Sequence, residues 1–332
     1  MTLNPRQLGR CALGALAIAA MLMTAACGGS SETTNSFRPS RLIVFGDETS
    51  VIVDINGTGN GSKYSVNAVA SADDPTVVCS LNPNWVQSLA SLYGLTFPEC
   101  NNDVPRVVAP TGRMRAVAGA RAFDLGPQID AQEAEGRLGA GDMVTVLIGA
   151  NDVLAEYQKF PAMTEAQLIA AVEAEGFEVG RQVNRIVNTG AKVLLATVID
   201  QGITPFAGAE RAAHTDVDRA ALLTHLTARF NALMRATIVN DGRKIGLILL
   251  DEHISVITKN SGLEGFTNFV DPVCDLTKST FRPPSILDCT ELTLVPGGNA
   301  TYLWADDRHL SASAQNSFAG IAITRAQNNP FF

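Results

Sequence analysis

The sequence has no excess of positive charge. Its 33 acidic side chains outnumber its 25 lysines and arginines, giving a formal net charge of -8 over 332 residues. No basic stripe is present that could neutralise phosphates, so we expect no nucleic acid or acidic partner. Only four histidines are available for acid/base work. The cysteines form no CxxC pair and have no histidine pattern near them, so we expect no metal site and no cofactor.

Internal repeats are also missing, and no linker divides the central part of the chain. With 46% apolar and 17% charged residues, the chain is long enough to bury one large core, or at most two smaller ones. These features exclude a fibrous or wholly disordered protein. We expect one folded domain over residues 41–332.

Residues 1–26 have the order of a secretory signal. Arg6 and Arg10 stand without any acidic neighbour, an apolar run follows from Ala12 to Met23, and small residues end the segment. Charged start, apolar core and small-residue exit are typical of a cleaved export signal. A single buried core helix is the structural alternative. We therefore expect an exported protein and exclude this segment from the fold.

Cys27 follows the small residues directly and begins a polar, Gly/Ser-rich stretch over residues 27–40. This arrangement is typical of a bacterial lipobox and its tether, although Thr24 stands where an aliphatic residue is usual. We expect acyl chains on Cys27 that attach the protein to a membrane of the cell envelope, the outer membrane or one facing the periplasm. A plain secreted protein cut near Ala26 is the alternative.

Four cysteines remain once Cys11 and Cys27 are set aside with the signal and the lipid. An even number in an exported protein favours two disulfides. Three pairings are possible, and the simplest joins neighbours along the chain. Each bridge would stabilise the fold by roughly 3 kcal/mol through loop entropy. The simplest pairing is Cys79 with Cys100 and Cys274 with Cys289.

Short apolar runs alternate with segments of helical periodicity along the chain. The runs read as buried strands, and the periodic segments read as amphipathic helices. Strands that alternate with helices predict an α/β fold with a parallel sheet covered on both faces. The expected strands are residues 42–45, 143–148, 192–199 and 245–250, and the expected helices are 83–93, 164–188, 216–239, 252–259 and 311–327. Residues 262–299 lack periodicity and read as a pinned loop.

Three polar blocks stand where ligands bind in such a sheet, beyond the carboxyl ends of the strands. They are Gly46-Asp47-Glu48-Thr49-Ser50, Gly149-Ala150-Asn151-Asp152 and Asp306-Asp307-Arg308-His309. In this order they resemble the GDS turn, the GxND turn and the late DxxH of the GDSL, or SGNH, hydrolases. Arg115 to Ala120 is similar to the AxGGA stretch of that family. The resemblance covers nearly all of the chain from Arg41 to Phe318.

The resemblance implies a three-layer, flavodoxin-like, doubly wound sheet and an acyl-transfer chemistry on lipid, acetylated sugar or small esters. In that chemistry His309 matches the proton acceptor and Asp306 the group that orients it. Asn151 and the Gly119 N–H match the oxyanion donors. Asp47 matches a residue that supports the first turn. The structural alternative is that Asp47 and Asn151 only cap helices or form turns.

The nucleophile departs from the family pattern, because Glu48 occupies the serine position. Ser50 is the nearest hydroxyl, but two residues further along a helical turn it points about 200° away. Glu48 could accept a hydrogen bond from His309 or activate a water with it, and a facing carboxylate would raise the histidine pKa. Three functions stay open: an ester hydrolase with an atypical nucleophile, a degenerate relative that binds a ligand without turnover, and a structural lipoprotein.

Overall fold

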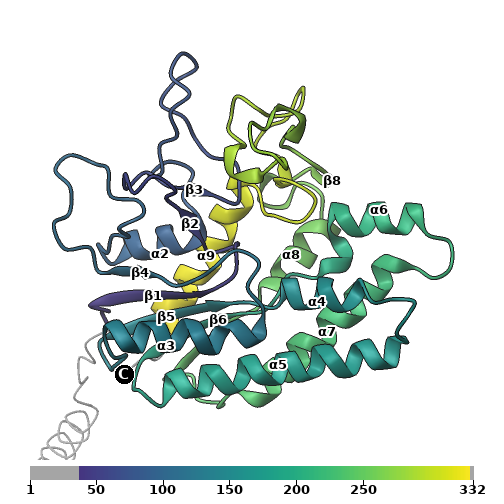
Figure 1. Ribbon diagram of the computed structural model, residues 1–332, viewed down its shortest axis with the longest axis horizontal. Coiled ribbons are helices and arrows are strands. Elements are labelled where there is room, and N and C mark those ends of the chain that lie inside the picture. The colour runs from purple at the N-terminus through teal and green to yellow at the C-terminus, as the bar shows by residue number, and fades with distance from the viewer. Residues whose placement is uncertain (1–36, 330–332) are drawn as a thin grey trace, which may run out of the picture. The chain divides into compact units, whose positions relative to one another are not determined.

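The computed structural model describes residues 37–329 (Figure 1). The predicted signal over residues 1–26, the predicted lipidation site Cys27 and most of the predicted tether lie outside the described residues. Within that part of the chain, no helix combines the length and the apolar content needed to cross a bilayer.

Five parallel strands form the central sheet. The strand order β4-β1-β5-β6-β7 places the second strand of the sheet beside the first and the later ones on the other side. This is the flavodoxin-like order. After β4 has been added on one side of β1, the remaining strands are added on the other side, so the direction of strand addition reverses between β1 and β5. The predicted fold class is therefore confirmed. The strands are β1 (Arg41–Gly46), β4 (Gly112–Met114), β5 (Asp142–Leu147), β6 (Lys192–Ala196) and β7 (Ile245–Ile248).

Helices cover both faces of this sheet (Figure 1). Ile43 and Phe45 of β1 belong to one apolar cluster with the helices of the first face, whereas Leu42 and Val44 are equally buried toward the other. Side chains alternate across a strand, so burial of all four means that both faces are packed. The first face carries α3 (Leu125–Glu135), α4 (Ala150–Tyr157), α5 (Glu165–Val187) and α7 (Arg219–Thr237); α2 (Trp85–Leu92) and α9 (Ala312–Asn328) pack together on the second.

Side-chain caps set where the predicted helices begin. Thr164 and Gln167 form the predicted capping box before α5, and Ser311 caps α9 through its bond from Ala314 N. Asp218 caps α7 in the same way, so that helix begins at Arg219, three residues after the predicted start. The short helices α3, α4 and α6 (Pro205–Ala213) were not predicted.

Both predicted disulfides are present, Cys79–Cys100 and Cys274–Cys289. The second pins the segment over residues 262–299 that was predicted to be a loop without strands or helices, and that prediction is wrong in part. Strand β8 (Asn268–Pro272) pairs in parallel with β9 (Tyr302–Trp304), and an apolar cluster surrounds the disulfide. Pairing with β9 orders β8, although the sequence of that segment has no periodicity of its own. The other short elements are β2 (Ile52–Val53), β3 (Ser62–Lys63), α8 (Leu250–Lys259), η2 (Ala122–Asp124), η3 (Gln201–Ile203), η4 (Leu263–Gly265), η5 (Leu276–Lys278) and η6 (Ile286–Asp288).

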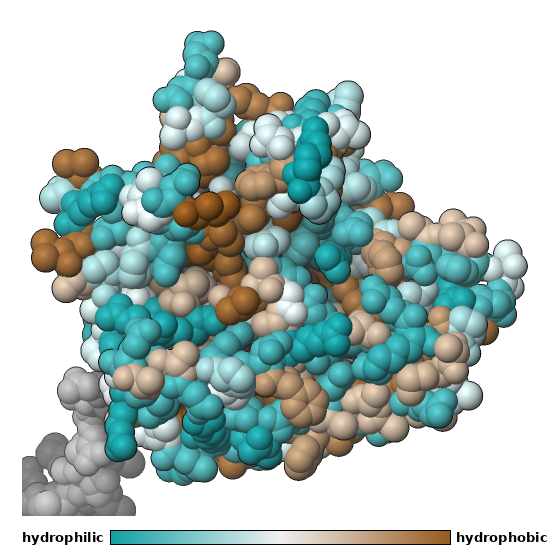
Figure 2. Space-filling view, viewed as in Figure 1, coloured by the Kyte–Doolittle hydropathy of each residue, from teal (hydrophilic) through white to brown (hydrophobic). Residues whose placement is uncertain are grey.

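Large exposed apolar side chains lie mainly on the loops. Figure 2 shows brown atoms gathered over the upper loops, whereas the helices in the lower half of this face are mostly teal or pale. Val104 and Val108, in the loop after the first disulfide, are 95% and 99% exposed.

Candidate functional site

The turn after β1 is held in one conformation by backbone shape and by a side-chain clamp. Gly46 has φ +136°, and a Cβ there would overlap the carbonyl oxygen of Leu147 on the neighbouring strand. The Gln128 amide donates to Gly46 O over 2.9 Å and accepts from Gly46 N over 2.8 Å. This clamp fixes the start of the turn that carries Glu48. The sequence offered no signal for Gln128, which is one of several polar residues in α3.

A second glycine positions Asn151. Gly149 follows β5 with φ +132°, and a Cβ there would overlap the ring of Phe230. The close approach of α7 to this turn therefore requires glycine. Helix α4 begins at the next residue, which places Asn151 in its first turn. The turns after β1 and β5 thus meet at the reversal point of the sheet, where open α/β folds bind ligands.

The Glu48 carboxylate lies on the two predicted oxyanion donors. Its Oε2 accepts hydrogen bonds from Gly119 N over 2.8 Å and from Asn151 Nδ2 over 2.9 Å. Gly119 has φ +78°, a backbone conformation that favours glycine. A negatively charged oxygen of the protein itself therefore occupies the place where such donors would stabilise a developing oxyanion.

His309 is held from one side by Asp306. The ring Nδ1 lies 2.7 Å from Asp306 Oδ2, and the other carboxylate oxygen accepts from the backbone N–H of His309 over 2.7 Å and of Arg308 over 3.0 Å. The opposite ring nitrogen, Nε2, lies 3.7 Å from Glu48 Oε1. That distance suits an ion pair and exceeds a hydrogen bond, and Nε2 has no hydrogen-bond partner among the described residues.

The charges of this cluster reinforce one another. Burial alone would raise the pKa of Glu48, but His309 and the two donors lower it to about 2. Burial alone would lower the pKa of His309, but the carboxylates of Asp306 and Glu48 raise it to about 10. At neutral pH the site therefore holds an imidazolium between two carboxylates. In this state His309 has no free lone pair with which to accept a proton.

Asp47 lies beneath the turn and does not reach this cluster through a hydrogen bond. Its Oδ1 accepts from Thr49 N over 3.0 Å, while Oδ2 is buried without a partner among the described residues. Burial and the charge of Glu48 raise the pKa of Asp47 well above its usual range. Its contacts are those of a residue that shapes the turn.

Ser50 is not brought to the site. Its side chain is completely buried, and its hydroxyl accepts a hydrogen bond from Trp85 Nε1 over 3.2 Å. The direction of the turn carries it toward α2, away from His309. This placement agrees with the direction expected for Ser50 from the helical turn: the hydroxyl would have to leave the core to reach a substrate.

A narrow cavity opens beside Glu48 and His309. Its volume of about 20 Å³ is room for about one water molecule. The amide Oε1 of Gln201, a residue 97% buried, has no partner among the described residues, and this residue also lines the cavity. The lining combines polar groups with apolar walls: Asp47, Glu48, Thr49, Leu147, Ala150, Asn151, Leu154, Val198, Ile199, Gln201, Arg308 and His309.

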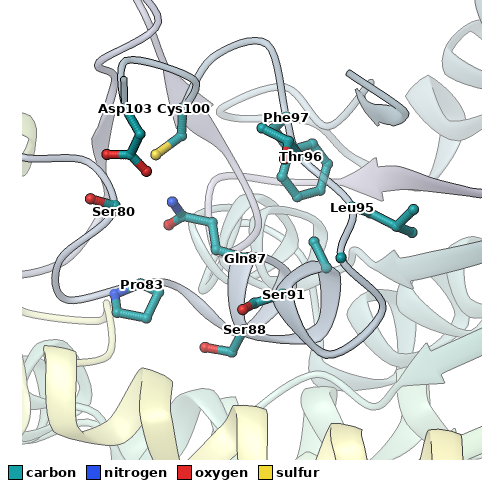
Figure 3. A pocket seen from close by; sticks show the side chains of 12 residues that line it. Ser80, Pro83, Gln87, Ser88, Ser91, Leu95, Thr96, Phe97, Cys100 and Asp103 are labelled. Carbon is teal, nitrogen blue, oxygen red and sulfur yellow. The ribbon is translucent and has the colours of Figure 1, made fainter. Parts of the chain in front are cut away.

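A larger cavity of about 480 Å³ lies beside α2 and the first disulfide (Figure 3). Hydroxyl and amide side chains such as Ser80, Ser88 and Gln87 surround it, together with Asp103. None of the predicted site residues apart from the disulfide cysteine Cys100 lines it. Among the described residues, no group of three or more histidine, cysteine, aspartate or glutamate side chains is arranged to hold a metal ion.

No family model and no curated protein matches this chain. Several solved structures are similar to it. An alpha/beta hydrolase enzyme, LAE5, from the metagenome of Lake Arreo is 14% identical, with 89% of this chain and 98% of that one covered and a TM-score of 0.43. Axe2, an acetylxylan esterase from Geobacillus stearothermophilus, is 13% identical over 88% and 96%, with a TM-score of 0.41. A member of the lipolytic protein G-D-S-L family from Veillonella parvula is 8% identical over 86% and 95%, with a TM-score of 0.39. The assignment of the fold class follows from the strand order and the covering helices of this chain itself.

Proposed function

We propose that this chain is an exported hydrolase of the GDSL/SGNH type in which Glu48, and not a serine, is the covalent nucleophile. One observation carries the proposal. Glu48 Oε2 is held by Gly119 N and Asn151 Nδ2, while Oε1 lies 3.7 Å from His309 Nε2 and Glu48 lines the cavity. Carboxylates form covalent intermediates in several classes of hydrolase, and this one is fixed with a single oxygen available for attack.

The two donors suit the second half of such a reaction. Once Oε1 carries a substrate group, Glu48 is itself an ester, and Oε2 is its carbonyl oxygen. Addition of water to that ester develops negative charge on Oε2, which already lies within 2.9 Å of Asn151 Nδ2 and 2.8 Å of Gly119 N. The machinery for ester hydrolysis would thus act on an ester of the protein's own side chain.

His309 would change its role when Glu48 is esterified. The negative charge of Glu48 is one of the two that hold the pKa of His309 at about 10. Its loss lowers the histidine pKa, so the ring can release its proton and then accept one from water. Asp306 keeps Nδ1 in place over 2.7 Å during that step.

The proposed location is the cell envelope, with attachment through acyl chains on Cys27. Cys27→Ala should release the protein from the membrane fraction of the producing cell. Recovery of the variant in the same membrane fraction would contradict the lipid anchor, and signal cleavage near Ala26 without lipid would then describe a secreted protein.

A second candidate is a ligand-binding protein without turnover. Two observations favour it. The cavity of about 20 Å³ is too small for an ester, and His309 is paired with both Glu48 and Asp306, which leaves it no free nitrogen to accept a proton. This candidate and the first differ in whether any covalent species forms on Glu48.

Glu48→Ser tests whether the hydrolytic machinery is intact. We expect the wild type to leave p-nitrophenyl acetate and a fluorophosphonate probe unreacted, and E48S to hydrolyse the first and to be labelled by the second at position 48. His309→Ala placed on E48S should abolish both. A folded E48S variant that stays inert would mean that the donors and His309 are not arranged for catalysis.

A further inference from the structure

We infer that the site acts on a short alkyl compound, such as a primary alkyl halide, in which a saturated carbon carries a group that departs as an anion. The inference rests on the proposed function, in which Glu48 is the nucleophile. It deepens that proposal by naming what Glu48 attacks. The juxtaposition that carries it is a carboxylate with one oxygen held by both oxyanion donors, beside a small cavity that has an apolar side.

The occupied donors argue against an acyl substrate in the first step. Attack on an ester develops charge on the substrate's carbonyl oxygen, which then needs oxyanion donors. Here Gly119 N and Asn151 Nδ2 already bind Glu48 Oε2. Displacement at a saturated carbon creates no such oxyanion, so the filled donors are no obstacle to it. They instead hold the nucleophile in one orientation.

The attacking oxygen is free to react. Glu48 Oε1 accepts no hydrogen bond from the described residues, and its nearest cation, His309 Nε2, is 3.7 Å away. An ion pair at that distance leaves the oxygen's lone pairs exposed to the cavity. The carboxylate is also ionised throughout the neutral range, because its pKa is about 2.

The cavity walls match an alkyl group. Leu147, Leu154, Val198 and Ile199 line it on the apolar side. Transfer of a hydrocarbon chain from water to such walls is favourable by about 0.8 kcal/mol for each buried CH₂. The volume of about 20 Å³ is room for a group the size of one water molecule or one methyl group, so we expect the shortest chains to react fastest.

The position of His309 restricts the leaving group. In a direct displacement the leaving group departs on the side of the carbon opposite the attacking oxygen, whereas His309 lies on the same side as Oε1. The imidazolium therefore cannot protonate it. A group that leaves as a stable anion needs no proton.

The reaction balances in two steps. In the first, Oε1 of Glu48 forms a bond to carbon as the carbon–halogen bond breaks, and the halide departs with the bonding electrons. His309 then releases its proton to solvent, because Glu48 is no longer charged. In the second, water adds to the Glu48 carbonyl carbon while neutral His309 takes its proton, and collapse expels the alcohol, which receives that proton. The carboxylic acid left at Glu48 then gives its proton to His309, which restores the ion pair. Overall, an alkyl halide and water give an alcohol, a halide ion and a proton.

The test uses the purified full chain with ethyl bromide and n-butyl bromide. We expect the wild type to release bromide over many turnovers, and faster with the ethyl compound. His309→Ala should release a single equivalent and keep the alkyl group on Glu48, visible in the intact mass and in the mapped peptide. The missing base should slow hydrolysis of the alkyl ester on Glu48 at least about 10²-fold. Glu48→Gln, which keeps the size of the side chain, should release none, whereas His225→Ala, an exposed histidine on α7, should behave as the wild type.

Isotopically labelled water gives an independent readout. In a single turnover the alcohol should carry the unlabelled oxygen of Glu48, and the label should appear in the Glu48 carboxylate. Label found first in the alcohol would overturn the covalent route.

Two failures are distinguishable. If no adduct forms on Glu48 in either His309→Ala or His309→Gln, while E48S hydrolyses p-nitrophenyl acetate, the machinery is intact and the alkyl assignment is wrong. If E48S is folded and inert as well, the proposed function fails together with this inference. Alkylation at residues other than Glu48 would also overturn it.

Discussion

The side-chain amide of Asn151 donates to Glu48 Oε2 over 2.9 Å, although the two residues are 103 positions apart in the chain. Amide donors of this kind stabilise the transient oxyanion of an acyl-transfer reaction. Here the donor is bound instead to a stable anion, the Glu48 carboxylate. Hydrogen bonds to a charged group contribute more than neutral ones, so the contact stabilises the folded protein as well as the geometry of the site.

We predict that Asn151→Ala destabilises the protein by about 1.5–3 kcal/mol, the usual effect of removing a hydrogen bond to a charged group. Chemical denaturation at neutral pH measures the change. Asn240→Ala, at an exposed position outside the helices, is the matched control and should change stability by less than about 0.5 kcal/mol. Equal stabilities of the two variants would mean that the Asn151 contact contributes nothing.

His309 should remain protonated across the range in which histidines usually titrate. Its pKa of about 10 follows from two carboxylates that outweigh its burial. Glu48→Gln removes one of these charges and should lower the pKa, while Asp306 keeps it from falling to that of an isolated buried ring. Nuclear magnetic resonance of the imidazole between about pH 5 and pH 8 measures this. A wild-type ring that titrates within that window would contradict the ion pair.

Stability should fall at alkaline pH. The folded-state pKa of His309 is raised from 6.5 to about 10, so its contribution is fully present below about pH 6.5 and is lost as pH rises through about 10. Denaturation midpoints of the wild type and His309→Gln, compared at the two ends of that window, test this. We expect the difference between the two proteins to shrink toward the alkaline end; a constant difference would argue against the linkage.

Acid should destabilise the site through the carboxylates. Glu48 and Asp306 have folded-state pKa values lowered from 4.5 and 3.8 to about 2. Their contribution is present above the ordinary values and is lost as pH falls through about 2. Asp47, whose pKa is raised, acts in the opposite direction. Glu48→Gln should therefore lose less stability on acidification than the wild type, as measured by thermal unfolding at a series of acidic pH values.

The second disulfide should matter for the site and the first only for stability. Cys274 N donates to Ala305 O over 2.8 Å, and both residues belong to the same apolar cluster. Ala305 is followed directly by Asp306. Replacing both Cys274 and Cys289 with alanine should cost about 3 kcal/mol, as expected for a loop of 15 residues, and should also lower the His309 pKa. The matched Cys79/Cys100 double variant should lose similar stability and leave that pKa unchanged.

The strands that the sequence predicted correctly are those with continuous apolar runs, such as β1 and β5, because burial on both faces requires such runs. Strand β4 escaped prediction, since three residues containing Arg113 form no run. That strand matters for the site: beyond it, Arg115 N and Val117 N continue the pairing with β1 at Val44 O and Gly46 O, and this pairing delivers Gly119 to Glu48.

The residues of the site could be found from the sequence, but their contacts could not. Glu48, Gly119, Asn151 and His309 were each placed at a strand end or before a helix, and the structure brings all four together. The sequence left open a hydrogen bond from His309 to Glu48 or a water activated by both, and it indicated that a carboxylate facing the imidazolium would form an ion pair. The structure has Glu48 Oε1 3.7 Å from His309 Nε2. The contact of Oε2 with the two donors was not predicted, because it is set by side-chain direction within the turn, which no pattern of residue types encodes.

A serine-directed label reports only on hydrolases that present a hydroxyl to it. Because the Glu48 carboxylate occupies its own donors, this chain would give no signal with such a label and would be counted among inactive proteins. The negative charge of Glu48 on those donors would also repel the boronates and phosphonates used to capture tetrahedral centres. Hydrolases built this way would come to light only through reagents that alkylate a carboxylate.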